Sequence, residues 1–370
     1  MDFNLTEGQQ LLQMTVREFF QEECSPDFIR RVEREGASAY RRLYAQMGEL
    51  GMFGLAFPEE IGGAGGNWLD VIIFFQEAGR RLVPGPLLET VALALPLLAP
   101  RDGASPPAWW RAVLLGKELA TAAWDLEGLT DLAVQPTGGG AGLAGRWSFV
   151  PHVDGARYVL LPAPQGERLA LALLDLKEAT VEQEACALQD CSTAAALHVK
   201  EARLPEAQWS EGGEVRARWD AALDRGKICV AAWGVGMMEE ALRLAVGYVG
   251  ERRQFGRPVG AFQALQHKLA NAKTALEKAR AATLYAASVA AREQPCRVEA
   301  ATAKLVTGRA AQEVTTIADL AYGGYGFIVD TDIQLFYRRA KHLQVWLGSA
   351  CEQERILLDA GPFMAAPLAG

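Results

Sequence analysis

Residues 251–270 read ERRQFGRPVGAFQALQHKLA, and they join a cluster of arginines to the start of a helical pattern. Arg252 is one of three arginines in this cluster, and Phe255 and Gly256 lie among them. Guanidinium groups pair with phosphate oxygens, and glycine lets the backbone approach a ligand closely. The stretch therefore indicates a site for a phosphate-bearing ligand at a helix end, although the same composition also suits a solvated charged face.

The apolar residues that follow keep a helical spacing. From Leu265 to Ala279 they recur at alternating steps of four and three, which predicts a seam that packs against a neighbouring helix. Similar periodicity covers most of the chain from about residue 215 onward. We therefore predict a C-terminal helical bundle over residues 214–370, in which YGGYGF at residues 322–327 forms a turn between two helices.

Two other parts precede this bundle. Residues 118–213 contain short apolar runs separated by Gly, Pro and Asp, which predict a small central β-domain of the barrel or sandwich type. Residues 1–117 read mainly as helices, and Thr6 followed by Gln9 has the spacing of a capping box. PEEIGGAGG at residues 58–66 has too many glycines for a helix and is predicted to be a loop. The predicted fold class is α+β.

Composition excludes several classes of function. The chain has 370 residues and a formal net charge of −8, which disfavours a broad nucleic-acid surface. Its six cysteines include no CxxC and its four histidines no HExxH, so we expect no metal site. The apolar stretch at residues 91–99 is too short to cross a bilayer. The N-terminus lacks the basic and then apolar order of a signal peptide, so we expect a cytoplasmic protein without membrane insertion.

One glycine pattern, Gly140-x-Gly142-x-x-Gly145, matches a dinucleotide-binding fingerprint letter for letter. That fingerprint requires a strand before it and a helix after it, so that the helix N-terminus faces a pyrophosphate. The residues that follow, RWSFVPHV, contain Pro151 and are typical of a strand and a turn. We therefore interpret the pattern as a hairpin loop.

Four blocks together resemble the flavin-dependent acyl-CoA dehydrogenases, and the resemblance runs nearly end to end. They are MDFNLTEGQQ at the start, MGELGMFGLAFPEEIGGAGG at residues 47–66, the block at 251–270, and YGGYGFIVDTDIQLFYRRAK at 322–341. The resemblance implies a helical N-terminal domain, a central β-domain and a C-terminal four-helix bundle. It also implies FAD, an acyl-CoA substrate, an electron-transfer flavoprotein or similar acceptor, and assembly as a dimer or a tetramer of dimers.

The resemblance also implies which residues hold the cofactor. In that family the ADP half of each FAD is held by the adjacent subunit. The matching positions for the diphosphate, the adenosine and the ADP turn are Arg252, Phe255, Gln263, Gly323 and Gly324. One neighbour departs from the pattern, because the family usually has Gln three residues before the first glycine and this chain has Leu320.

The catalytic base of the family is missing at both of its usual positions. The expected chemistry removes an α-proton with a Glu carboxylate and transfers a β-hydride to the flavin, and it depends on that base. One family position for Glu falls on Leu347 and the other on Gly226, and neither residue can accept a proton. Asp224 is a weak candidate, and Glu352 lies five residues beyond Leu347. Residues two apart on a helix lie about 200° around its axis, so Asp224 does not simply substitute.

The β-domain departs from the family as well. Its usual Thr-Glu-Pro motif is absent from AAWDLEGLTD at residues 122–131, and Pro151 stands roughly where a flavin-contacting Thr is expected. Proline offers neither a hydroxyl nor an amide N–H. The half-site for the flavin ring is thus eroded, whereas the half-site for a neighbour's ADP is kept.

This asymmetry leads to the hypothesis of a non-catalytic, FAD-clamping subunit of a heteromeric acyl-CoA dehydrogenase, of α2β2 type. Its second, dehydrogenase-like subunit supplies the base, and its substrate is a bulky CoA thioester from lipid or steroid degradation, with a steroid side chain or a ring-bearing acyl group. The alternatives are an active homo-oligomer with Asp224 as base, a catalytically dead scaffold that binds an acyl-CoA or a partner, and a flavin oxidase.

Overall fold

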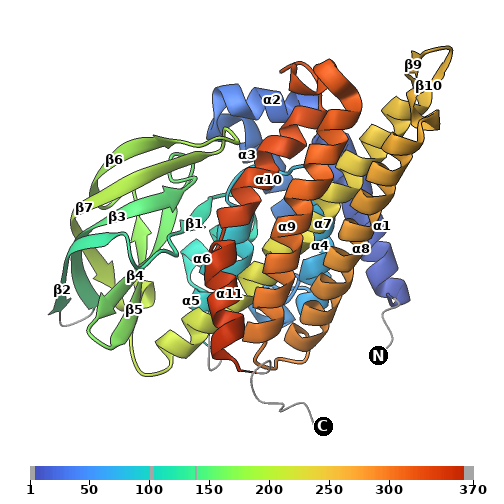
Figure 1. The fold of residues 1–370 in the computed structure, drawn as a ribbon. Coiled ribbons are helices and arrows are strands. Elements are labelled where there is room, and N and C mark those ends of the chain that lie inside the picture. The colour runs from blue at the N-terminus through green and yellow to red at the C-terminus, as the bar shows by residue number, and fades with distance from the viewer. Residues whose placement is uncertain (1–4, 101–103, 138–139, 362–370) are drawn as a thin grey trace, which may run out of the picture. The chain divides into compact units, whose positions relative to one another are not determined.

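The computed structural model describes residues 5–100, 104–137 and 140–361, and the chain divides into two compact units (Figure 1). Unit 1 comprises Met1–Pro26, Trp68–Val83 and Lys227–Gly370, and unit 2 comprises Asp27–Asn67 and Pro84–Gly226. The predicted domain boundaries at residues 117 and 213 remain a prediction. In the described residues no helix has the length and apolar character needed to span a membrane.

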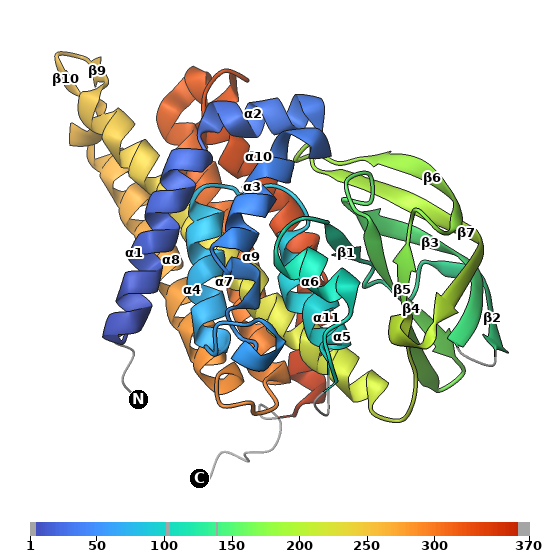
Figure 2. The ribbon, with the colours of Figure 1, turned by 180° about the vertical axis from the view of Figure 1, so that it is seen from behind.

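Unit 1 is a bundle of helices, as the periodicity predicts. Figure 2 shows α1 and α4 side by side, and these two helices are in contact. The elements of this unit are α1 (Glu7–Glu23), α4 (Trp68–Arg80), most of α7 (Val215–Glu251), β9 (Arg253–Gln254), β10 (Arg257–Pro258), η5 (Val259–Ala261), α8 (Gln263–Ala290), α9 (Arg297–Tyr322), η6 (Gly323–Phe327), α10 (Ile333–Val345) and α11 (Ala350–Asp359).

Unit 2 carries the β-domain. Its short helical elements are α2 (Pro26–Glu35), α3 (Ala37–Glu49), η1 (Met52–Gly54), η2 (Glu59–Ile61), η3 (Glu89–Ala94), α5 (Leu95–Leu98), α6 (Ala108–Leu114) and η4 (Glu206–Gln208). Its strands are β1 (Ala120–Ala122), β2 (Leu129–Thr137), β3 (Gly140–Pro151), β4 (Tyr158–Gln165), β5 (Arg168–Asp175), β6 (Thr180–Ala187), β7 (Thr193–Pro205) and β8 (Trp209–Ser210).

The strands form two four-stranded sheets, in the orders β1-β4-β5-β8 and β2-β3-β7-β6. Only the β1–β4 pair is parallel, and the other pairs in these sheets are antiparallel. Apolar residues of both sheets share one core, which contains the buried ring of Trp147. The indole N–H of Trp147 donates to the carbonyl of Pro162 at 3.0 Å, so this large side chain is buried without an unsatisfied donor.

Local sequence signals account for several element boundaries. The capping box at Thr6 is confirmed, because the Thr6 hydroxyl accepts from the Gln9 amide and the Gln9 side chain accepts from the Thr6 amide. The sequence over residues 40–53 is helix-like and predicts a helix there, but α3 ends earlier, at Glu49. Gly51 has φ = 71°, a left-handed conformation that glycine adopts at little cost, and it stops the helix.

The glycine pattern of residues 140–145 lies inside strand β3, which pairs with β2 and β7. No helix follows it, so rejecting the dinucleotide fingerprint is confirmed, although the residues form a strand rather than a loop. Strands β2 and β6 do not coincide with the short apolar runs that predict the β-domain. Strand β6 is mostly exposed and polar, and an exposed edge strand has no apolar alternation to reveal it.

Helices α4 and α7 approach each other closely at two glycines. A side chain on Gly79 would overlap the backbone oxygen of Trp233, and one on Gly236 would overlap the backbone oxygen of Gln76. Backbone atoms within packed helices cannot rotate away as a flexible side chain can. The two glycines therefore set the distance between these helices.

Gly236→Ala is expected to lower the free energy of unfolding by about 1–3 kcal/mol, because the added methyl forces α4 and α7 apart. Urea unfolding measures this change. Gly247→Ala on the same helix is the matched control, since nothing lies within 4 Å of a methyl there. The free energy of unfolding of the control should rise by about 0.5–1 kcal/mol, because alanine has a higher helix propensity than glycine. Equal effects from the two variants would contradict the packing argument.

Candidate functional site

The arginine cluster forms a small hairpin between α7 and α8. Gln254 pairs with Arg257, so Phe255 and Gly256 make a two-residue turn, and both have positive φ (52° and 78°). Such turns require a left-handed conformation at both positions, which is unfavourable for a residue with a bulky side chain. Phe255 is nevertheless held there with 90% of its surface exposed. Its ring meets that of Phe262 edge to face, with centroids 6.0 Å apart, but this contact leaves most of the Phe255 surface uncovered.

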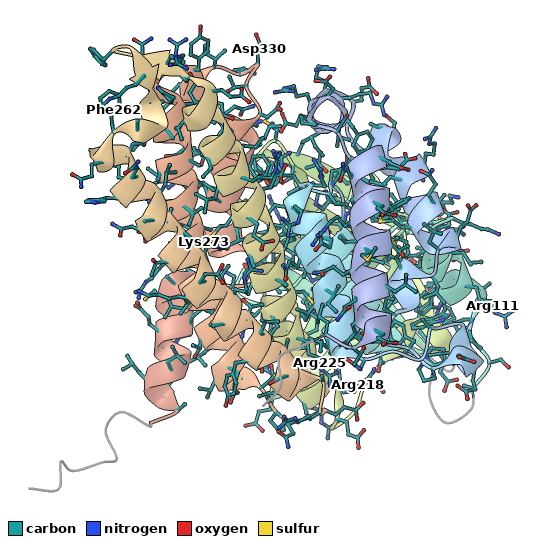
Figure 3. All side chains as sticks on the ribbon, turned by 90° about the vertical axis from the view of Figure 1, so that its right-hand side faces the viewer. Arg111, Arg218, Arg225, Phe262, Lys273 and Asp330 are labelled. Carbon is teal, nitrogen blue, oxygen red and sulfur yellow. The ribbon has the colours of Figure 1, made fainter. Side chains whose placement is uncertain are left out.

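The hairpin and the glycine turn η6 lie at the same end of unit 1. Figure 3 labels Phe262, just after the hairpin, and Asp330, just after η6, at that end. The guanidinium of Arg252 lies over the ring of Tyr325 in η6, 6.0 Å from its centroid. We call Arg252, Phe255, Gln263, Gly323 and Gly324, together with Tyr325, the clamp face. All of these residues are exposed, and all except Tyr325 are the predicted cofactor positions.

The clamp face suits an anionic ligand. Gly323 has φ = 62°, which favours glycine, and nothing lies within 4 Å of a methyl placed on Gly323 or Gly324. A ligand can therefore approach the backbone of this turn closely, and the Arg252 guanidinium can pair with phosphate oxygens. These residues fit the ADP half of FAD. Their role in binding remains a prediction.

Apolar side chains next to the clamp face are also exposed. Phe327 is 72% exposed and Val329 is 74% exposed, while Leu320, at the position of the family's Gln, is 50% exposed. Exposed apolar residues that gather beside a polar ligand site are typical of a surface that another protein chain covers. From the sequence alone, Leu320 is only a departure from the family pattern.

Leu347 lies in the turn between α10 and α11, which we call the 346–349 turn. The Leu347 side chain is buried, at 4% exposure, and its backbone has φ = 54°. Gly348, which follows, has φ = 105°. The residue at this predicted base position is therefore an apolar side chain in a strained backbone, and it provides no proton acceptor.

Glu352 does not take over that role. It is the third residue of a capping box at the start of α11, where its carboxylate accepts from the Ser349 amide at 2.6 Å and from the Ser349 hydroxyl at 2.7 Å. These hydrogen bonds hold the pKa of Glu352 below its usual value. A carboxylate with a lowered pKa that is engaged in capping is a poor general base.

Gly226 and Asp224 both lie within the continuous helix α7 and both are buried. Because the helix is unbroken there, these residues project in different directions, as the sequence argument requires. Asp224 is 8% exposed and remains the weak candidate for a base. In the described residues, no group of three or more metal-ligating side chains could hold a metal ion.

In the β-domain, both β1 and the segment that follows it are hydrogen-bonded to β3. The Thr121 hydroxyl donates to the carbonyl of Pro151 at 2.6 Å, in a buried hydrogen bond. The Ser148 amide donates to the carbonyl of Gly128 at 3.1 Å, and the Ser148 hydroxyl donates to the same carbonyl. These hydroxyls and this amide are thus committed within the chain rather than available to a flavin ring.

Two aromatic rings stand beside these hydrogen bonds. Trp124, which follows β1, and Phe149 of β3 meet edge to face with centroids 5.6 Å apart, and both are partly buried. A proline, committed hydroxyls and an aromatic pair provide few of the donors that an isoalloxazine needs. The residues of this half-site do not fit the flavin ring.

Sequence reasoning missed Asp319, which lies beneath the glycine turn. It is 4% exposed, one carboxylate oxygen has no hydrogen-bond partner, and a methyl on Gly326 would lie 2.7 Å from that oxygen. Burial raises the pKa of Asp319 above its usual value. A single acidic residue in the otherwise apolar stretch before the glycines is the only signal in the sequence.

Asp319→Asn is expected to be more stable than the wild type at pH 7, by on the order of 1 kcal/mol. With its folded pKa raised, Asp319 favours folding below its unfolded pKa, and this contribution is lost as pH rises through the folded pKa. The difference in folding stability between the variant and the wild type should therefore shrink as pH falls toward 4. Thermal unfolding across this pH range measures it, and a pH-independent difference would count against a buried carboxyl group.

Comparison with known proteins identifies the family. Residues 6–99 match the family model of the acyl-CoA dehydrogenase N-terminal domain, and residues 217–360 match that of the C-terminal domain. Acyl-CoA dehydrogenase IpdE2 of Mycobacterium tuberculosis is 30% identical over 335 residues, which cover 90% of this chain and 91% of that protein.

Solved structures are similar over nearly the whole chain. The crystal structure of the ChsE4–ChsE5 complex from Mycobacterium tuberculosis matches with a TM-score of 0.88 and 26% identity, and covers 99% of this chain and 100% of that chain. The Tcur3481–Tcur3483 steroid ACAD matches with a TM-score of 0.83 and 27% identity, and covers 95% of this chain and 97% of that chain.

The fold and these matches define the class, that of FAD-dependent oxidoreductases that act on the CH–CH bond of an acyl-CoA. Within it, this chain belongs to the acyl-CoA dehydrogenase family. The fold expected from the sequence resemblance, with helices, a β-domain and a helical bundle, is confirmed.

Proposed function

We propose that this chain is the non-catalytic, FAD-clamping subunit of a heteromeric acyl-CoA dehydrogenase of α2β2 type. The observation that carries the proposal is an asymmetry between two half-sites. The clamp face keeps open glycines and an exposed arginine, whereas the β-domain and the 346–349 turn lack the groups for flavin-ring contact and proton abstraction. A heteromer needs each half only once per site.

The exposed clamp face supports a role toward a second chain. Phe255 is 90% exposed in a strained turn, and Phe327 at the end of η6 and Val329 just after it are more than two-thirds exposed. Burying such side chains against a partner removes apolar surface from water, at about 25 cal/mol per Å². The partner we propose is a dehydrogenase-like chain that carries FAD in its own cleft and supplies the catalytic Glu.

FAD bound in the complex would supply the acceptor for the hydride equivalent of the acyl-CoA. This chain contributes binding and orientation, through the Arg252, Phe255 and Gln263 side chains at the diphosphate and the adenosine. Its own position 347 contributes no base. Glu352 and Asp224 remain in the roles that the structure gives them, capping α11 and lying buried in α7.

We further propose a bulky acyl group, with a steroid side chain or a ring-bearing acid, and an electron-transfer flavoprotein or similar acceptor. Support comes from similar structures, one described as a ChsE4–ChsE5 complex and another as a steroid ACAD. Both descriptions name two chains. Halving the number of active sites per tetramer leaves room for a larger acyl group at each site.

The test is the visible spectrum of the protein purified alone and with a base-bearing partner chain. We expect colourless, inactive protein alone, and a yellow complex that oxidises a bulky acyl-CoA. A yellow, active protein without any partner would overturn the subunit proposal. In that case Asp224→Asn decides whether Asp224 is the base of a homo-oligomer, because the variant should then lose activity. A complex that binds acyl-CoA without electron transfer would instead favour the scaffold.

A further inference from the structure

One buried cation in unit 1 has no part in the proposed clamp. Lys304 of α9 is 2% exposed, and its ammonium donates to the carbonyl oxygens of Leu343 at 2.9 Å, Gln344 at 3.3 Å and Gly348 at 3.2 Å. The first two carbonyls belong to the last turn of α10, which has no further helical N–H to bind them. The third belongs to the 346–349 turn. All three ammonium protons therefore join α9 to the end of α10 and to the 346–349 turn.

The 346–349 turn is strained and is held at several points. Leu347 and Gly348 both have positive φ, and Leu347 is the residue for which this is unfavourable. Gln353 of α11 is buried, and its side-chain amide donates to the carbonyl of Leu347 at 3.5 Å. Ser349 is fixed by the capping box of α11. A strained conformation persists only where the surroundings over-determine it, and such positions gather at functional sites.

The charges that face Lys304 come from two other helices. Glu352 of α11 favours the charged ammonium, and Lys227 of α7 disfavours it, while α10 presents its backbone carbonyls. Burial is the largest effect and lowers the pKa of Lys304 to about 8. At neutral pH the ammonium is still charged, which suits the negative end of the α10 dipole.

We infer that Lys304 is a positioning residue, which holds the 346–349 turn closed and so fixes the inward placement of the side chain at position 347. This inference does not depend on the proposed clamp or partner, because it concerns contacts within unit 1 alone. It predicts that the turn, and not the bundle as a whole, depends on the ammonium. Replacing a buried charge by an apolar side chain often leaves global stability unchanged or raised, so the two effects are separable.

The test compares Lys304→Met with the wild type by hydrogen exchange on the full chain, followed by mass spectrometry. The amides of Trp346 and Gly348 donate to α10 carbonyls and report closure of the turn. We expect their exchange to accelerate at least tenfold, because three charge-assisted hydrogen bonds are lost. Exchange in the middle of α8 and α9, and the melting temperature, should change little.

Two further variants make the result decisive. Lys278→Met removes an exposed lysine from α8 and should leave turn exchange unchanged. Lys304→Gln keeps an amide that can donate to two carbonyls, so its turn exchange should fall between wild type and Lys304→Met, and it serves if the methionine variant does not fold. Unchanged turn exchange in both Lys304 variants, or an equal acceleration throughout unit 1, would overturn the inference.

Discussion

Replacing Glu77 by alanine is expected to lower the free energy of unfolding by about 3 kcal/mol. Glu77 of α4 is 1% exposed and accepts hydrogen bonds from Arg17 of α1 at 2.8 and 3.0 Å and from Arg80 at 3.1 Å. Removing a partner from a buried ion pair typically costs about 3–5 kcal/mol. We take the lower end because the Arg17 side chain is 44% exposed and water can solvate it.

The Glu77 contacts belong to a network that joins four helices. Arg80 of α4 also pairs with Glu239 of α7, and Glu239 pairs with Arg280 of α8. The Arg80 and Glu239 side chains are largely buried, so the network is little screened by salt. Loss of Glu77 leaves Arg80 with one carboxylate fewer at the junction of α1 and α4.

Urea unfolding of Glu77→Ala at neutral pH measures this effect, and two controls bracket it. Glu77→Gln keeps the shape and one acceptor oxygen, so it should lower the free energy of unfolding less than Glu77→Ala does. Lys273→Ala removes an exposed ion pair with Glu277, of a kind that contributes about 0–1 kcal/mol. Figure 3 shows Lys273 on the outer side of α8. If the Glu77 and Lys273 variants lost equal stability, burial would not be the source of the effect.

Arg252→Ala is expected to weaken FAD retention by roughly ten- to a hundredfold in the complex with a base-bearing partner. The variant removes a charge-assisted contact to the diphosphate, which is worth about 1.5–3 kcal/mol. Arg252 is exposed at the end of α7, and its guanidinium reaches across to Tyr325 of η6. The side chain is therefore oriented toward the glycine turn and is not needed within the chain's own core.

Flavin absorbance after extensive dialysis of the complex measures the loss. Arg216→Ala is the matched control, because Arg216 is an exposed arginine on α7 that pairs with Asp220 and lies outside the clamp face. The control should keep its flavin. Raising the salt concentration should weaken wild-type retention more than that of Arg252→Ala, since screening acts on the charge that the variant lacks. Equal flavin content in all three proteins would remove Arg252 from the proposed site.

Local signals in the sequence predicted much of the fold for identifiable reasons. The capping box at Thr6 and the apolar seam from Leu265 to Ala279 act over a few residues, so they are visible in the chain itself. Strand β6 escaped prediction because its exposed edge carries no alternating pattern. The end of α3 near Gly51 was misplaced because the periodicity continues past the glycine that stops the helix.

The sequence by itself determined the family, the three kinds of structural part and the absence of Glu at positions 347 and 226, because motifs and residue types are properties of order along the chain. Only the tertiary structure decided how the remaining groups are used. Glu352 is committed to a helix cap, Lys304 reaches three carbonyls of another helix and its turn, and Asp319 lies buried without a full set of partners. Such roles depend on burial and on contacts between distant segments, which the order of residues does not display.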